Sequence, residues 1–101
     1  MGKQLYELSF WIKLNADTEK ELEKIINLIQ KNEGEIVYKD IPQKKEMAYP
    51  INKEKVGYFS YIVFKAPKDK IERIKKDLLF FKNLLRYLII KRKILFPKEK
   101  V

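Results

Sequence analysis

The sequence predicts a small α+β domain of order βαββαβ, in which two helices cover one face of a four-stranded antiparallel sheet. Two observations predict this class: strand-like and helix-like apolar patterns follow one another in that order, and turn residues separate them. A chain of 101 residues suffices for one hydrophobic core. We therefore expect a single domain over residues 1–96 and a basic, flexible tail over residues 97–101.

The first strand is predicted over residues 6–14, where apolar and polar side chains alternate with the period of an extended chain. The pattern then breaks, and Thr18 followed by Glu21 fits the capping box of a helix that begins there. Gly34 is placed to end this helix with a left-handed cap. The helix has one apolar face, made by Leu22, Ile25, Ile26 and Ile29.

The second strand is predicted to be a bent edge strand that begins at Glu35. Pro42 interrupts it, because proline removes a donor from the hydrogen-bond ladder, and the strand resumes toward Tyr49 before Pro50. The third strand, over residues 56–65, is the most aromatic segment of the chain.

Pro67 begins the second helix, whose buried stripe is expected to hold Ile71, Ile74, Leu78 and Leu79. A turn near Asn83 then leads to the fourth strand, over residues 84–93. This order is the ferredoxin-like arrangement, in which the first and third strands lie in the middle of the sheet.

The alternation of side chains along the strands assigns them to two faces. The core face is expected to hold Tyr6, Leu8, Phe10, Ile12, Tyr58, Ile62, Phe64, Tyr87 and Ile89. The opposite face is expected to hold Glu7, Ser9, Trp11, Phe59, Tyr61, Val63, Arg86, Leu88, Ile90 and Arg92. Covering one large apolar side chain is worth about 1.5–3 kcal/mol, so this second set predicts a partner, a dimer or a nucleic-acid platform. A wrong assignment of the faces, or a tail folded across the sheet, is the alternative.

The charge balance favours a polyanionic partner. The chain has 23 basic and 14 acidic residues, a net charge of +9, and neither cysteine nor histidine. Phosphate backbones are the first candidate for such a partner and anionic membrane surfaces the second. The missing residue types disfavour catalysis, a soft metal site and any cofactor, and we expect no small-molecule substrate. No apolar run is long enough for a membrane span and no targeting segment is seen, which predicts a cytoplasmic protein.

The most informative motif is the basic pair Lys44-Lys45 followed by Met47-Ala48-Tyr49-Pro50-Ile51-Asn52-Lys53 and, a few residues later, Gly57-Tyr58-Phe59. It resembles the signature of the bacterial small-subunit ribosomal protein six family. Tyr6-Glu7, Gly34-Glu35, Asn83, Arg86 and the run Leu88-Ile89-Ile90-Lys91 continue the resemblance, which covers about nine tenths of the chain. Two departures are Gln43, where the family usually has glycine, and lysines where it usually has arginines.

The resemblance implies a structural protein of the small ribosomal subunit, without catalysis, that binds the central domain of the small-subunit ribosomal RNA together with small-subunit protein eighteen. For the RNA, the expected contacts form a basic rim of Lys3, Arg86, Lys91, Arg92 and Lys93. For the partner protein, the expected contacts are Trp11, Lys44, Lys45, Tyr49, Pro50, Phe59, Tyr61 and Leu88.

The chief alternative is a stand-alone binder of single-stranded RNA with the same topology, since RNA recognition motifs stack bases on exposed aromatic residues of their central strands. Trp11 and residues 59–64 approximate such a platform, although Glu7 on the same face would repel phosphate. A ligand-sensing or metal-carrying domain is a weaker alternative, because the chain has no Cys or His and no glycine-rich turn that could hold a phosphate.

Overall fold

The structure is a computed structural model in which residues 2–51 and 53–93 are described. The elements follow the predicted order, and the expected ferredoxin-like α+β fold is confirmed. In chain order they are β1 (Gln4–Ile12), α1 (Thr18–Lys31), β2 (Glu35–Lys39), β3 (Gln43–Ile51), β4 (Glu54–Ala66), the 3-10 turn η1 (Lys68–Lys70), α2 (Ile71–Leu78) and β5 (Leu84–Lys91). The tail predicted over residues 97–101 lies outside the described residues.

The sheet is antiparallel, and its order is β2-β4-β1-β5 with β3 also paired to β4. Within the described residues it therefore has five strands, not the predicted four. The difference arises at the predicted bend: the chain leaves the ladder around Pro42, so one bent edge strand becomes β2 and β3, which pair with successive stretches of the long β4. β1 and β4 are central, as predicted.

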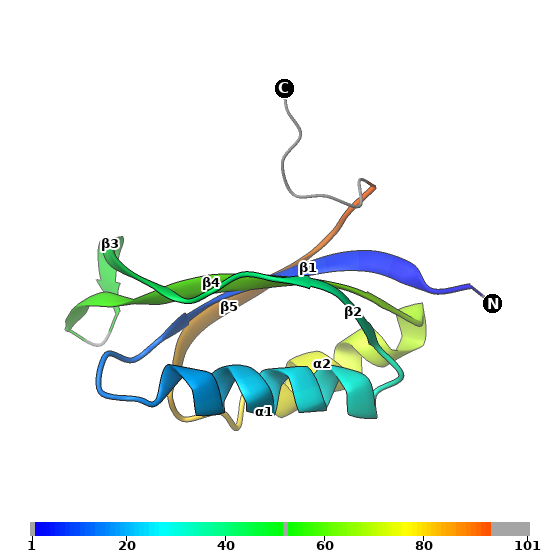
Figure 1. Ribbon diagram of the computed structural model, residues 1–101, viewed down its shortest axis with the longest axis horizontal. Helices are drawn as coiled ribbons and strands as arrows, with labels where there is room; N and C mark the ends of the chain where they lie inside the picture. Colours follow the sequence, from blue (N-terminus) through cyan, green and yellow to red (C-terminus); the bar gives the residue numbers. More distant parts are fainter. Residues whose placement is uncertain (1, 52, 94–101) are drawn as a thin grey trace.

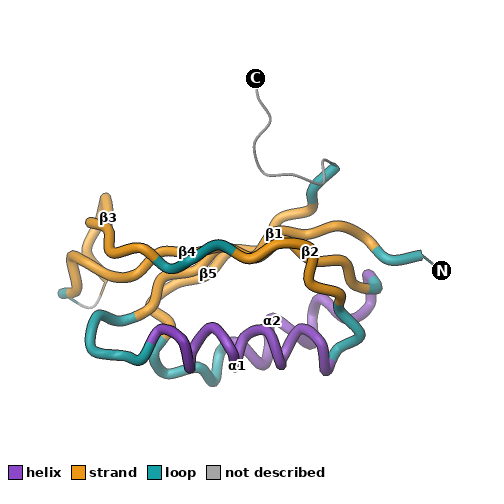
Figure 2. Tube along the Cα trace, viewed as in Figure 1, coloured by secondary structure: helices purple, strands orange, loops and turns teal. Residues whose placement is uncertain are grey.

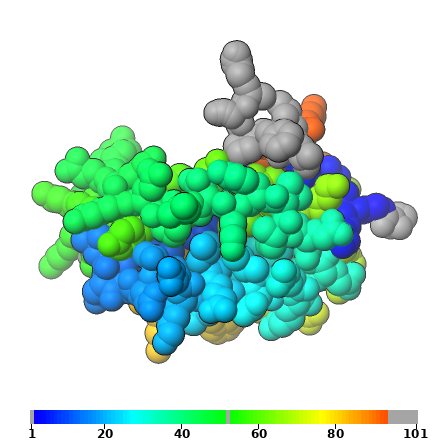
Figure 3. Space-filling model, in the orientation of Figure 1, coloured from blue at the N-terminus to red at the C-terminus, as the bar shows by residue number. Residues whose placement is uncertain are grey.

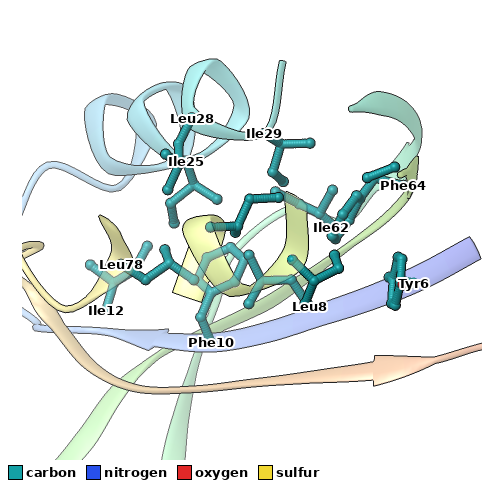
Figure 4. Close-up of a cluster of buried hydrophobic side chains, with 13 residues drawn as sticks. Tyr6, Leu8, Phe10, Ile12, Ile25, Leu28, Ile29, Ile62, Phe64 and Leu78 are labelled. Atoms are coloured by element: carbon teal, nitrogen blue, oxygen red, sulfur yellow. The ribbon is translucent and has the colours of Figure 1, made fainter. Parts of the chain in front are cut away.

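Both helices lie on the same face of the sheet, and among the described residues no helix lies on the opposite face (Figures 1 and 2). Figure 3 shows β2 and β3, in green, running along the edge of the sheet above α1. Between sheet and helices lies one apolar core, in which β1 contributes alternate residues and α1 and α2 contribute their apolar stripes (Figure 4). The expected core residues Tyr58, Tyr87 and Ile89 pack against its margin, and the other six are fully part of it.

The beginning of α1 differs from the predicted capping box. Asp17, not Thr18, is the N-cap: its Oδ1 accepts hydrogen bonds from the backbone N–H groups of Glu19 and Lys20 at 3.1 and 3.3 Å. Glu21, expected to bond back to the cap, is instead buried and accepts a hydrogen bond from Asn83 at 2.8 Å. A carboxylate at the N-cap satisfies the same free donors that a threonine would.

The end of α1 also differs from the prediction. The left-handed residue is Glu33, with φ of 66°, and Gly34 follows it. The backbone N–H of Gly34 donates to the carbonyl of Ile29 at 2.8 Å and that of Glu33 to Gln30 at 3.1 Å, which is a Schellman motif. A Cβ on Gly34 would lie 2.3 Å from Cγ2 of Ile29, so position 34 has room only for glycine.

The bounds of two strands and of the second helix differ from the prediction. β1 begins at Gln4 and ends at Ile12, two residues earlier at each end than predicted, and leaves Leu14 exposed; β5 ends at Lys91, two residues before the predicted end. α2 ends at Leu78, so Leu79, expected in its buried stripe, is exposed. A 3-10 turn precedes α2, so Pro67 begins the turn and not the helix itself. No helix in the described part of the chain is long and apolar enough to span a membrane.

Candidate interaction surface on the open face of the sheet

The open face of the sheet is its surface opposite the two helices. The pairing register places three rows of side chains across β5, β1 and β4 on this face: Arg86, Trp11 and Phe59; Leu88, Ser9 and Tyr61; Ile90, Glu7 and Val63. These nine residues, with Tyr38 and Lys45 from the edge strands, are what we call the open face. The nine residues of the three rows are among the ten that side-chain alternation predicted for this face, and Tyr38 and Lys45 are additions that it did not predict.

The first row holds an aromatic pair between two basic side chains. The ring centroids of Trp11 and Phe59 lie 5.2 Å apart, and Nζ of Lys45 lies 5.3 Å from the Phe59 centroid. Arg86 is exposed beside Trp11 on β5. The row therefore offers flat apolar surface with a positive charge at each end, an arrangement suited to a polyanion or to a protein partner.

The second row contains a tyrosine pair that the sequence did not predict. Tyr38 and Tyr61 have ring centroids 5.7 Å apart, and the hydroxyl of Tyr38 donates to Oδ1 of Asp40 at 3.3 Å. Burial, followed by the nearby carboxylate of Asp40 and the Tyr38 side chain, raises the pKa of Tyr61 to about 12. Strict alternation would place Tyr38 on the core face with Ile36, but a β-bulge between these two residues turns it to the open face.

The β5 side of the open face is its most exposed apolar part. Leu88 is 60% exposed and Ile90 46% exposed, while Trp11, Phe59 and Tyr61 are half-buried. None of these five side chains is sealed inside the monomer. A partner laid across this face would remove apolar area from water on three adjacent strands, β5, β1 and β4.

The charge of Glu7 on this face is compensated. Its Oε1 is ion-paired with the guanidinium of Arg92, which also extends the sheet through a hydrogen bond from its backbone N–H to the carbonyl of Leu5 at 2.8 Å. Both side chains are mostly buried. Arg92, expected to contact RNA, is thus held by Glu7, and the repulsion that Glu7 would exert on a phosphate is reduced.

The structure divides the predicted RNA-binding residues into two groups. Lys3, Lys91, Arg92 and Lys93 lie at one end of the sheet, where β1 begins and β5 ends. Arg86, on β5, lies opposite Trp11. It precedes Arg92 by six residues, a separation of roughly 20 Å along the strand. Lys3 is an exposed residue whose Nζ lies 3.9 Å from Oε2 of Glu35, while Lys91 and Lys93 are exposed.

The predicted protein-binding residues also separate into two sets. Trp11, Lys45, Phe59, Tyr61 and Leu88 come together on the open face. Lys44, Tyr49 and Pro50 lie on β3, and the pairing register slips between Glu46 and Ile51, where Pro50 cannot donate to the ladder. β3 nevertheless continues through Pro50 to Ile51, two residues beyond Tyr49, where the strand was predicted to end. Tyr49 is 76% exposed, so its ring is available to a partner.

Within the described residues, no group of three or more acidic, histidine or cysteine side chains could hold a metal ion. The open face contains flat rings, aliphatic side chains and cations, and these are groups that recognise surfaces. The geometry therefore describes a binding face.

Comparison with known proteins shows the family of the chain. Residues 5–91 match the protein family described as Ribosomal protein S6. The chain belongs to the ribosomal protein S6 family. It is 36% identical over 78 residues to the small ribosomal subunit protein bS6 of Pelagibacter ubique, and the aligned region covers 77% of this chain and 64% of that protein. It is 34% identical over 88 residues to the bS6 protein of Clostridioides difficile, and the aligned region covers 84% of this chain and 95% of that protein.

The fold comparison points the same way. The crystal structure of 30S ribosomal protein S6 from Thermotoga maritima has a TM-score of 0.75 and 21% identity, and the match covers 89% of this chain and 88% of that one. Membership of the ribosomal protein S6 family confirms the predicted class: the chain is a structural protein of the bacterial small ribosomal subunit and not an enzyme. Its location is the cytoplasm, within the ribosome.

Proposed function

We propose that this chain binds the central domain of the small-subunit ribosomal RNA jointly with small-subunit ribosomal protein eighteen. The observation that carries the proposal is the open face, where large apolar side chains of β1, β4 and β5 lie between basic groups and no helix of the described chain covers them. Family membership supports the ribosomal setting.

The protein partner is assigned to the open face and to β3. The rings of Trp11 and Phe59 lie against each other, with centroids 5.2 Å apart, and Leu88 and Tyr61 extend this apolar surface across the sheet. Aromatic anchors of this kind dominate the energetics of protein interfaces. Lys44, Lys45, Tyr49 and Pro50 are assigned to the rim of the same contact, where the exposed ring of Tyr49 offers a further anchor.

The RNA is assigned to the basic end of the sheet. Lys3, Lys91 and Lys93 are exposed there, and Arg92 contributes to the same end although it is paired with Glu7. Arg86 is assigned to a separate phosphate contact beside Trp11. The logarithm of RNA affinity falls linearly with the logarithm of salt concentration. Each phosphate that a lysine or arginine neutralises makes the slope of that line steeper by about 0.7–0.9.

The experiment has two stages. A tagged form of the chain is first recovered from cells of its host, and we expect small-subunit RNA and small-subunit proteins to be recovered with it. Binding of the purified chain to a transcript of the central domain is then measured with and without protein eighteen. We expect protein eighteen to tighten binding.

Variants separate the two assigned contacts. Leu88→Glu should abolish the effect of protein eighteen, because it places an unpaired charge in an apolar contact. Lys91→Gln with Lys93→Gln should weaken RNA binding and reduce its salt dependence with or without protein eighteen. Lys20→Gln, an exposed position on α1, is the control. Recovery of no ribosomal component, or an unchanged response to protein eighteen in Leu88→Glu, would contradict the proposal.

The second candidate function is stand-alone binding of single-stranded RNA. The observation in its favour is that Trp11, Phe59 and Tyr61 lie on the two central strands of the open face, as base-stacking residues do in RNA recognition motifs. This function predicts that Trp11→Ala or Tyr61→Ala weakens binding of an unstructured oligonucleotide by about 1–3 kcal/mol per stacked base. The joint function predicts that the same changes act mainly on the response to protein eighteen.

A further inference from the structure

A second surface lies on the helical side, between α1 and the turn that joins α2 to β5. It is a groove of about 770 Å³ whose walls are Lys24, Asn27, Leu28 and Lys31 of α1, and Asp77, Phe80, Phe81, Lys82 and Asn83. Two contacts hold the walls together: Nζ of Lys24 lies 5.9 Å from the Phe81 centroid, and Asn83 donates to Glu21 at 2.8 Å. The groove is therefore part of the folded domain and distinct from the open face.

Phe80 is the unusual residue of this groove. Its side chain is 81% exposed, and among the described residues no ring or cation lies against it. Its neighbour Leu79 is 73% exposed but does not line the groove. A free, flat ring at the rim of a groove presents a face on which another planar group can stack.

The charge of the groove selects an anion. Three lysines line it against the single carboxylate of Asp77. Lys24 already forms an ion pair within the chain, since its Nζ lies 3.5 Å from Oε2 of the buried Glu21. Lys31 and Lys82 are exposed and can contact a ligand. A second copy of this chain is a poor occupant, because each copy carries a net charge of +9.

We propose that this groove binds a short single-stranded segment of RNA, with an unpaired base stacked on Phe80 and the neighbouring phosphates held by Lys31 and Lys82. The exposed amide of Asn27 lies in the same wall and can bond to the edge of that base. The proposal rests on the proposed function, in which this chain lies on ribosomal RNA, and it assigns a second RNA contact on the side away from the sheet.

RNA fits the groove better than an acidic peptide. A peptide needs a slot in which an apolar anchor is fully desolvated, and Phe80 instead projects from the rim. Base stacking needs only an accessible ring face with cations nearby, and that combination is found here. The two occupants therefore differ in what they require of position 80: a peptide requires apolar volume, and a base requires a ring.

The experiment measures binding of the full chain to a fluorescent single-stranded RNA of about ten nucleotides at low salt. Phe80→Ala should weaken binding roughly 5- to 150-fold, the range that corresponds to one stacked base. Phe80→Leu should weaken it nearly as much, because leucine keeps apolar volume and loses the ring face. Lys31→Gln should lower the slope of the salt dependence by about 0.7, the value for one neutralised phosphate of a single strand. Leu79→Ala, at an exposed neighbouring position outside the groove, should bind like the unmodified chain.

Three results would overturn the proposal. The first is no binding of the RNA by the unmodified chain, and the second is binding that Trp11→Ala weakens and Phe80→Ala does not, which would place the strand on the open face. The third is a polyglutamate peptide bound as tightly as the RNA, with Phe80→Leu unaffected, which would make the groove a peptide site. The central-domain transcript, tested in parallel with protein eighteen, reports on the proposed function independently of the groove.

Discussion

Asn83→Ala tests how the turn before β5 is attached to α1. Nδ2 of Asn83 donates to Oε2 of Glu21 at 2.8 Å, and the Glu21 side chain is only 5% exposed. The other carboxylate oxygen, Oε1, is buried and has no hydrogen-bond partner among the described residues. Alanine keeps the backbone bond from Lys13 N–H to the carbonyl oxygen of residue 83, at 2.9 Å, so the substitution isolates the side-chain bond.

The expected loss of stability follows from this geometry. A hydrogen bond to a charged group is worth about 1.5–3 kcal/mol, and its removal leaves a buried carboxylate with Lys24 at 3.5 Å as its remaining compensation. We therefore expect Asn83→Ala to lower the free energy of unfolding by about 2 kcal/mol and the midpoint temperature by about 8–16 °C. Urea unfolding followed through the fluorescence of Trp11, the one tryptophan of the chain, measures this.

A double substitution separates the bond from its surroundings. Adding Glu21→Gln to Asn83→Ala should recover part of the loss, because a neutral amide costs less to bury than an unpaired carboxylate. Lys82→Ala, the exposed neighbour, is the control and should change stability by less than about 0.5 kcal/mol. Strict additivity of the two changes, or a loss below about 0.5 kcal/mol for Asn83→Ala, would refute this account of the turn.

Three further predictions concern other parts of the fold. Gly34→Ala should destabilise the protein by about 1–3 kcal/mol in thermal unfolding, because its Cβ would meet Ile29, whereas Glu33→Gly, at the left-handed position, should not destabilise it by more than a few tenths. Since the pKa of Tyr61 is raised to about 12, its contribution to the free energy of unfolding is complete below pH 10 and is lost as pH rises toward 12; Tyr61→Phe should flatten that decline in alkaline urea titrations. Tyr49→Ala should leave stability within about 0.5 kcal/mol while weakening partner binding, because the ring is 76% exposed; a comparable loss of stability would mean that the ring packs locally.

The sequence predicted the strands and helices well where one side of an element is buried. Apolar and polar residues alternate along β1 because only one of its faces lies in the core. α1 and α2 each carry one apolar stripe, because only one side of each helix packs against the sheet. The ends were predicted less well. At α1, Asp17 and Thr18 are both good caps, and Glu33 and Gly34 can both follow the last turn, so local chemistry leaves more than one solution.

The candidate site shows the same division. Trp11, Phe59, Tyr61 and Leu88 were assigned to one face from alternation alone. Tyr38 was missed because a bulge reverses its side, and a bulge depends on how two strands are paired rather than on either strand's sequence. The split of the basic residues into two groups, and the pairing of Arg92 with Glu7, likewise depend on distances between strands.

By itself, then, the amino-acid sequence determined the order of the elements, the position of the core and the family. The first two can be read from the sequence because burial of one face gives each helix and strand a periodic apolar pattern, and the family can be read because its motif is a continuous run of residues. Only the tertiary structure decided which cations share a surface, which side of the sheet Tyr38 occupies, and that Phe80 lines the same groove as lysines of α1. These are relations between segments distant in the chain. They are fixed by strand register and helix packing, and no local pattern encodes them.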